Sequence, residues 1–212
     1  MTQTSRSQLF DEWAKNYDNS ITSEKDDFPF AGYEMILEQV LSLADVKPNM
    51  RILDLGIGTG NLAARFINKG CHVWGLDFSA EMLTQTQVKL PQVKLVQANL
   101  LGDWIEELQT PFDRVVSAYV FHEFNLETKI KLLQQISSHC LSTNGFILVA
   151  DIAFPDVAIR TAASQHWQWD DDEYYWAADE AVIACDQAGL QVSYEQISNC
   201  GGVFKFTSKG AG

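Results

Sequence analysis

The sequence predicts an α/β protein in which a mostly parallel sheet carries helices on both faces. Short apolar runs alternate with helical segments from about residue 51 to residue 150, a pattern typical of a parallel sheet covered on both sides. A glycine-rich turn joins the first of these runs to the following helix. The chain then ends in two alternating runs that predict an antiparallel hairpin. We therefore predict a doubly wound, mostly parallel sheet with a C-terminal hairpin at its edge.

Hydrophobic periodicity places the individual elements along the chain. Apolar residues at three- and four-residue steps predict N-terminal helices at 9–17 and 33–41, and Phe28-Pro29-Phe30 between them predicts an extended connector. Ser79 is the expected N-cap of one later helix. The later helices are predicted at 62–67, 80–89, 126–140, 156–169 and 174–188. The strands are predicted at 51–55, 72–76, 93–97, 114–117, 146–150, 191–197 and 203–207.

The composition is that of an ordinary globular protein with an excess of acidic residues. The 212 residues include 28 Asp and Glu against 15 Lys and Arg, a formal net charge of -13. That charge repels polyanions and anionic lipids, so we expect no nucleic acid and no membrane as a partner. The N-terminus lacks a signal-peptide pattern, and four widely spaced cysteines argue against a disulfide framework. These features predict a cytoplasmic protein, which we expect to be a monomer or a homodimer.

The densest signal in the sequence is a glycine-rich turn at 53–61. A strand ends there, Gly56, Gly58 and Gly60 follow at alternate positions, and a helix begins. In an open α/β sheet ligands bind at this point, lying against bare backbone. A dinucleotide fingerprint would place its third glycine at position 61, which is Asn61. The Asp54 carboxylate opposes a pyrophosphate and favours a cation, so S-adenosylmethionine, with an amine, a sulfonium and no phosphate, is the expected ligand.

A second anchor follows the second predicted strand. Asp77 ends that strand, where a carboxylate can accept hydrogen bonds from both hydroxyls of a ribose. Phe78 beside it can lie on an adenine face, and Met82 follows one helical turn later. Dinucleotide enzymes also use an acid near this place, so Asp77 gains its weight from these neighbours.

These motifs resemble those of the class I S-adenosylmethionine-dependent methyltransferases. Leu53–Gly60 is similar to their motif I, Gly75–Leu83 to their second motif, and Phe112–Ser117 to their fourth-strand motif. The segment 10–18 and the tail around 170–180 resemble small, poorly characterised bacterial members of the YrrT type. The resemblance implies a sheet of seven strands, with the last hairpin giving one antiparallel strand.

The resemblance also implies roles for individual residues. Asn99 stands where the family usually has an Asp near adenine N6, and an amide oxygen can still accept from that group. Leu100 follows it in the same segment. Ser117, at the end of the fourth strand, would border the methionine part of the cofactor. Tyr17 resembles a tyrosine that closes over the cofactor, and it can also be a helix-face aromatic that docks the N-terminal segment.

A catalytic group is expected beyond the fourth and fifth strands. His122 follows the fourth strand and is a base, a group that orients the acceptor, or a partly buried histidine bonded to backbone. Asp151, placed just past the fifth strand, can line the pocket or cap a turn, and Tyr33 is expected in the core. The acidic run Asp170–Glu173 among aromatic residues is either a lid for a cationic acceptor or a solvated helix N-terminus. Its spacing resembles no calcium loop, and we predict no metal site.

The leading functional hypothesis is a methyltransferase that acts on a small-molecule acceptor. Two alternatives stay open from the sequence, a non-catalytic module that binds S-adenosylmethionine and a nicotinamide-dependent oxidoreductase. We predict one domain over residues 1–212. Its expected parts are an N-terminal helical cap at 1–48, a cofactor-binding half at 49–151, a lid insertion at 152–180, and the end of the last helix with the hairpin at 181–212.

Overall fold

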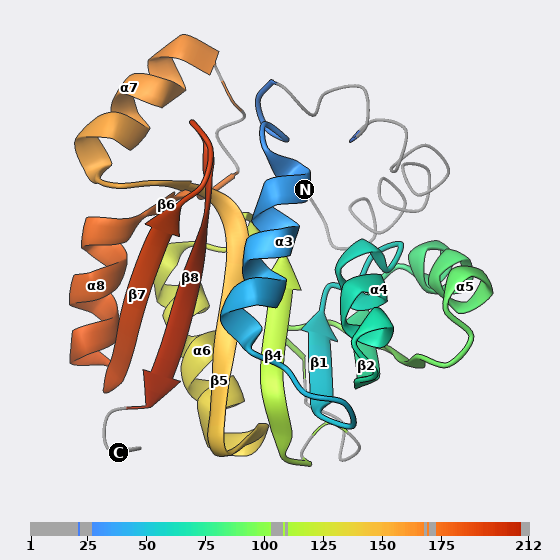
Figure 1. Ribbon diagram of the computed structural model, residues 1–212. Helices are drawn as coiled ribbons and strands as arrows, with labels where there is room; N and C mark the ends of the chain where they lie inside the picture. The colour runs from blue at the N-terminus through green and yellow to red at the C-terminus, as the bar shows by residue number, and fades with distance from the viewer. Residues whose placement is uncertain are drawn as a thin grey trace.

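The computed structural model describes residues 21, 27–102, 108, 110–167, 169 and 173–208 (Figure 1). The predicted helix at 9–17 and the run Asp170–Asp172 lie outside these residues. The strands are β1 (Arg51–Leu55), β2 (His72–Asp77), β3 (Lys94–Gln97), β4 (Phe112–Ala118), β5 (Leu141–Phe154), β6 (Trp176–Ala177), β7 (Leu190–Gln196) and β8 (Gly201–Ser208). The helices are α3 (Tyr33–Ala44), α4 (Asn61–Asn68), α5 (Ala80–Lys89), α6 (Leu126–His139), α7 (Val157–Trp167) and α8 (Ala178–Gln187), with a 3₁₀ turn, η2, at Phe121–Glu123.

The sheet has the predicted mixed topology. Its strand order is β3-β2-β1-β4-β5-β8-β7, and the strands from β3 to β5 run parallel to one another. β8 runs antiparallel to both β5 and β7, which confirms the C-terminal hairpin. The described part of the chain has eight strands, not seven, because Trp176–Ala177 forms a short strand beside residues 153–154 at the end of β5.

Two hydrophobic cores lie on opposite faces of this sheet. Strand residues alternate between them, so Ile52 packs with α3 and α4 while Leu53 packs with α6 and α8. Figure 1 shows α3 and α4 in front of the sheet and α6 behind it. The doubly wound arrangement predicted from the strand–helix alternation is confirmed.

Local capping explains where the helices of the sheet start. The Ser79 hydroxyl accepts a hydrogen bond from the Met82 N–H at 3.1 Å, which confirms Ser79 as the N-cap of α5. Asn125 caps α6 in the same way through Thr128 N–H at 2.9 Å. In the described part of the chain no helix is both long and apolar enough to cross a membrane.

Three predicted elements differ from the observed ones. β5 continues to Phe154 instead of ending at residue 150, because Asp151 is buried inside the strand with hydrogen-bond partners. Residues 174–177 are extended, and α8 begins only at Ala178, because Trp176 joins β5 and packs against aromatic rings of the sheet. Residues 28–32 form turns where an extended connector was predicted.

Candidate active site

The parallel strands bring most of the predicted site residues to one edge of the sheet. β1, β2 and β4 all end there, and each is followed by a segment that the sequence singled out. The glycine turn follows Leu55, Asp77 is the last residue of β2, and His122 lies four residues after Ala118. This edge is where open α/β sheets bind ligands.

The glycine turn is closed against the neighbouring strand and loop. Gly56 has φ +69°, and a Cβ there would lie 2.4 Å from Val120, so only glycine fits. Gly58 also has a positive φ, of +53°, but a Cβ at this position would have a carbonyl oxygen 4.0 Å away as its nearest neighbour. The Gly58 N–H donates to Asp77 Oδ2 at 2.9 Å. The turn is therefore rigid on its protein side and open beside Gly58.

Asp54 is a buried carboxyl group beside this turn. Its residue is 1% exposed, and its Oδ2 has no hydrogen-bond partner within the described residues. Burial, with a contribution from the charge of Asp77, raises the pKa of Asp54 to about 8, and a hydrogen bond from the Ala63 backbone opposes the shift. A small cavity of about 20 Å³ adjoins it, enough for one ammonium group or one water. The cavity is lined by Tyr33, Asp54, Gly56, Ile57, Thr59, Asn61, Leu62 and Ala118.

These features fit the amine and sulfonium of the expected cofactor. An orphaned carboxyl oxygen in a buried pocket gains most from a cationic partner, because the cation restores the charged form. The open backbone at Gly58 allows close approach of a ligand. Tyr33, predicted in the core, is buried and also lines this pocket. The sequence missed that second role because helical periodicity reports burial and not what a buried ring faces.

The other residues predicted to bind the cofactor differ from one another in their exposure and in their hydrogen-bond partners. Asp77 accepts backbone hydrogen bonds on both of its oxygens, from Gly58 and from Ser79, each at 2.9 Å. Phe78 beside it is 37% exposed, whereas Met82 is buried at the start of α5. The Asn99 Oδ1 accepts from Leu101 N–H at 2.9 Å, so the amide oxygen predicted to reach adenine already has a local donor.

Three further predicted residues differ in their placement. Leu100 is buried and follows Asn99 at the same edge. Ser117 is fully buried, and its hydroxyl donates to the Leu55 carbonyl at 2.7 Å, so it ties β4 to β1 and its side chain does not reach the pocket. The sequence could not show this, because a serine that bonds to a neighbouring strand and a serine that borders the cofactor can both stand at the end of a strand. Tyr17 lies outside the described residues.

His122 is held by a buried carboxylate. Its Nδ1 lies 2.7 Å from Asp151 Oδ1, and Asp151 is fully buried in β5. The same carboxylate accepts from Ile152 N–H at 2.9 Å and from the Trp176 indole N–H at 3.2 Å. Because Asp151 is an acceptor for its other donors, we assign the proton between the two groups to His122 Nδ1. The lone pair of His122 Nε2 is then available for other partners.

Two acidic side chains that the sequence did not connect lie next to His122. Glu123 Oε1 is 3.6 Å from His122 Nε2, and one carboxylate oxygen of Glu173 lies within 4.8 Å of both groups. Glu173 also accepts a hydrogen bond from the Tyr175 hydroxyl, and the Tyr175 ring packs edge-on to the imidazole. Fifty residues separate Glu173 from His122 along the chain, so no local motif could have predicted this contact.

Fold and site together are those of an α/β protein with a buried carboxyl group beside a glycine turn, at the edge where open sheets bind ligands. A family model described as a methyltransferase domain matches residues 52–145. An uncharacterised methyltransferase of Geobacillus kaustophilus is 32% identical over 201 residues, covering 89% of this chain and 90% of the relative. The uncharacterised methyltransferase YrrT of Halobacillus halophilus is 29% identical over 202 residues, covering 90% and 92% of the two chains.

The fold comparison agrees with the sequence comparison. The solved structure of DhpI in complex with SAH superposes with a TM-score of 0.76 at 15% identity, covering 98% of this chain and 97% of that one. The chain belongs to the family of S-adenosylmethionine-dependent methyltransferases that includes these uncharacterised bacterial relatives. S-adenosylmethionine is therefore its cofactor, and membership of a methyltransferase family gives no support to the alternative of a nicotinamide-dependent oxidoreductase.

Proposed function

We propose that this enzyme methylates a small-molecule acceptor and that His122 takes the proton from the acceptor's nucleophile. The observation that carries the proposal is the 2.7 Å contact between His122 Nδ1 and the buried Asp151. A carboxylate behind an imidazole fixes the tautomer and stabilises the imidazolium that forms when Nε2 accepts a proton. His122 follows β4 at the ligand-binding edge of the sheet, where an acceptor meets the cofactor.

The cofactor supplies the reactive group, and the protein supplies its position. S-adenosylmethionine, when bound, carries a methyl group on a sulfonium that a nucleophile can displace in line. Asp54 would hold the amine of the cofactor and Asp77 its ribose hydroxyls. Phe78 and Asn99 would face the adenine. Each of these roles needs only side chains that already lie at this edge.

The lid predicted at 152–180 supports a small acceptor. Phe28 stacks on Trp167 with centroids 4.7 Å apart, and Trp169 contacts Tyr175 at 4.6 Å. Phe154, at the end of β5, stacks on Trp169 at 5.9 Å. This aromatic cluster joins the segment before α3 to the segment after α7 above the sheet edge. A cover of that kind excludes water from the reacting groups and limits the size of the acceptor.

Charge and cysteine chemistry support the remaining parts of the proposal. A net charge of -13 disfavours nucleic acid and anionic lipid as acceptors. All four cysteines are buried and free, and burial raises the pKa of Cys140 and of Cys185 to about 12. Free thiols fit the reducing cytoplasm that we propose as the location. We propose a monomer or a homodimer as the assembly.

Cofactor binding and turnover test the proposal separately. Calorimetry with S-adenosylhomocysteine should give one site per chain in the wild-type protein and no binding in Asp77→Ala. Product formation should then be followed with small hydroxyl, carboxyl, amine and thiol acceptors. His122→Ala should lower kcat by about 10²- to 10⁴-fold on an accepted substrate without changing the cofactor Kd.

Two results would count against the proposal. Equal cofactor binding by wild type and Asp77→Ala would remove Asp77 from the ribose role. Tight cofactor binding without turnover of any acceptor would favour the non-catalytic module.

His139→Ala is the matched control for His122→Ala. His139 is exposed on α6 and, within the described part of the chain, bonds only to the Gln135 carbonyl of its own helix.

A further inference from the structure

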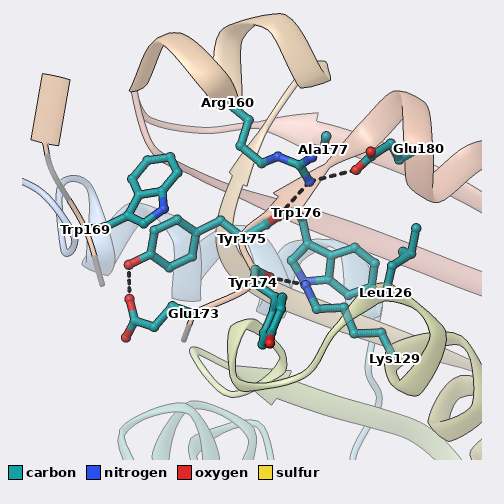
Figure 2. A pocket seen from close by; sticks show the side chains of 10 residues that line it. All are labelled: Leu126, Lys129, Arg160, Trp169, Glu173, Tyr174, Tyr175, Trp176, Ala177 and Glu180. Atoms are coloured by element: carbon teal, nitrogen blue, oxygen red, sulfur yellow. Dashed lines mark hydrogen bonds and ion pairs between the residues drawn. The ribbon is translucent and has the colours of Figure 1, made fainter. Parts of the chain in front are cut away.

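A second, larger cavity lies beside segment 173–177. Residues of α6, α7 and α8 form the rest of its wall. Its volume is about 290 Å³, close to the lower limit of the usual size of a small-ligand pocket. Figure 2 shows Lys129 and Leu126 of α6 on one side of it and Arg160 and Glu180 on the other, with Trp176 between them. Of these side chains, Trp176 alone belongs to the proposed methyl-transfer site as described above, through its hydrogen bond to Asp151.

Lys129 is the unusual member of this lining. The residue is 2% exposed, yet its ammonium makes no ion pair with a carboxylate in the described part of the chain. Nζ donates to the Tyr174 carbonyl and lies 4.1 Å from the centre of the Trp176 ring (Figure 2). A buried charge is costly unless it is paired, and an ammonium has three donors. Among the described residues, the carbonyl and the ring leave this ammonium without a charged partner.

The neighbouring cation, Arg160, has the carboxylate partner that Lys129 lacks among the described residues. Arg160 Nη1 donates to Glu180 at 2.7 Å and to the Tyr175 carbonyl at 3.1 Å, so its charge is balanced within the cavity wall. Lys129 forms no ion pair with either carboxylate of that wall, Glu173 or Glu180, within the described part of the chain. Burial, with a smaller contribution from the charge of Arg160, lowers the pKa of Lys129 to about 7 against the opposing charges of Asp151 and Glu180. An anion beside Nζ would stabilise the charged form.

We propose that this cavity binds a small organic acid and that the Lys129 ammonium holds its carboxylate. Leu126, Tyr174 and Trp176 offer apolar and aromatic surface for the body of such a molecule. The two acidic side chains in the wall, Glu173 and Glu180, repel a doubly charged phosphate more strongly than a singly charged carboxylate. Glu173 and Tyr175 line this cavity and also lie beside His122, so the organic-acid site adjoins the proposed acceptor site and differs from it by the contacts of Lys129.

Benzoate is the probe, because it combines one carboxylate with an aromatic ring. Its binding is followed by calorimetry and by tryptophan fluorescence, to which Trp176 in the cavity wall contributes. Lys129→Met keeps the apolar stem and removes the charge, so it should weaken benzoate binding by roughly 10- to 100-fold. Lys131→Met is the matched control on the same helix, since Lys131 is 70% exposed and pairs with Glu127 at the surface. It should bind benzoate like the wild type.

The pH dependence separates a charged partner from a merely structural lysine. The titratable and charged groups of the described chain that act on Lys129 or share its cavity are Asp151, Arg160, Glu173, Tyr174, Tyr175 and Glu180. Benzoate affinity should fall as the pH rises above about 7, because the ammonium deprotonates. At pH 8 binding should take up a proton, so the calorimetric heat should change with the ionisation enthalpy of the buffer. In Lys129→Met both effects should disappear.

Four results would overturn the proposal. They are equal binding of benzoate and of neutral benzamide, equal binding by wild type and Lys129→Met, tighter binding of inorganic phosphate than of benzoate, and no saturable benzoate binding at all. Thermal unfolding of Lys129→Met shows whether the variant is folded. If it is not, the benzoate–benzamide comparison and the proton uptake of the wild type still decide the question. Cofactor binding measured in parallel is expected to be unaffected in every variant.

Discussion

The buried carboxyl of Asp54 makes a prediction about stability as well as binding. Its pKa rises from 3.8 to about 8 on folding, mainly because burial removes the carboxyl from water. An acid with a raised pKa in the folded state lowers the free energy of unfolding, and this loss of stability is absent below about pH 4. It grows as the pH rises towards 8, because the unfolded chain ionises first and the folded chain does not. Replacing Asp54 with Asn removes that loss.

The size of the effect follows from the pKa difference. The interval between the unfolded-state pKa of 3.8 and pH 7 is about three pH units, and each unit corresponds to about 1.4 kcal/mol. Asp54→Asn should therefore stabilise the unliganded protein by at most roughly 4 kcal/mol at pH 7. At pH 4 the two proteins should be nearly equal. The same substitution removes the charge offered to the cofactor amine, which should weaken cofactor binding by about 10- to 100-fold.

Urea unfolding at pH 4, 5.5 and 7 measures this difference. A gain of several kcal/mol at pH 7 corresponds to a midpoint shift of about 1 M urea or more. Asp186→Asn serves as the control, because Asp186 is exposed on α8 and should show no such pH-dependent gain. The reasoning is refuted if Asp54→Asn is no more stable than the wild type at pH 7, or if its gain is the same at every pH.

Further predictions follow from the geometry of the site. Gly58→Ala should cost only about 1–2 kcal/mol of stability, because its Cβ meets open space, but calorimetry should show cofactor binding lost as the methyl fills that space. Gly75→Ala should be more destabilising in thermal unfolding, because its Cβ would lie 2.2 Å from Ile57 Cδ1. Asp151→Asn should lower kcat by about 10²- to 10⁴-fold at unchanged cofactor Kd, whereas a loss of cofactor binding would contradict the positioning role. Activity should survive treatment with EDTA, and added Zn²⁺ should inhibit the enzyme by binding His122 Nε2. If EDTA abolished activity and added metal restored it, His122 would be a metal ligand instead of a base.

The residues that we propose to bind the cofactor could be singled out from the sequence because their signals are local. The glycines, Asp54 and Asp77 each lie at the end of a strand, and strand ends meet at one edge whenever a sheet is parallel. The acceptor half depends on contacts that are distant in sequence. Glu173 lies beside His122 where residues 174–177 leave the predicted helix and Trp176–Ala177 pair with β5. Periodicity carries no information about such a pairing.

Asp151 shows a second limit of prediction from sequence. A charged residue within an apolar run normally marks a strand end, and the prediction therefore ended the strand at residue 150. The strand continues because His122, the Ile152 backbone and the Trp176 indole all contact this carboxylate. Buried polar groups persist where every partner is supplied, and the two partners that come from other segments, His122 and Trp176, cannot be read from the sequence of the strand.

Tyr174 has a consequence for how the two cavities communicate. Its backbone N–H donates to the His122 carbonyl at 2.7 Å, and its own carbonyl accepts from Lys129. A single residue is thus tied on one side to the proposed base and on the other to the proposed anion site. A ligand that moves this residue at one end changes the free energy of binding at the other, and thermodynamic reciprocity makes the two changes equal. An organic acid held by Lys129 would therefore change the acceptor affinity at His122 by the same factor by which the acceptor changes the affinity for the acid.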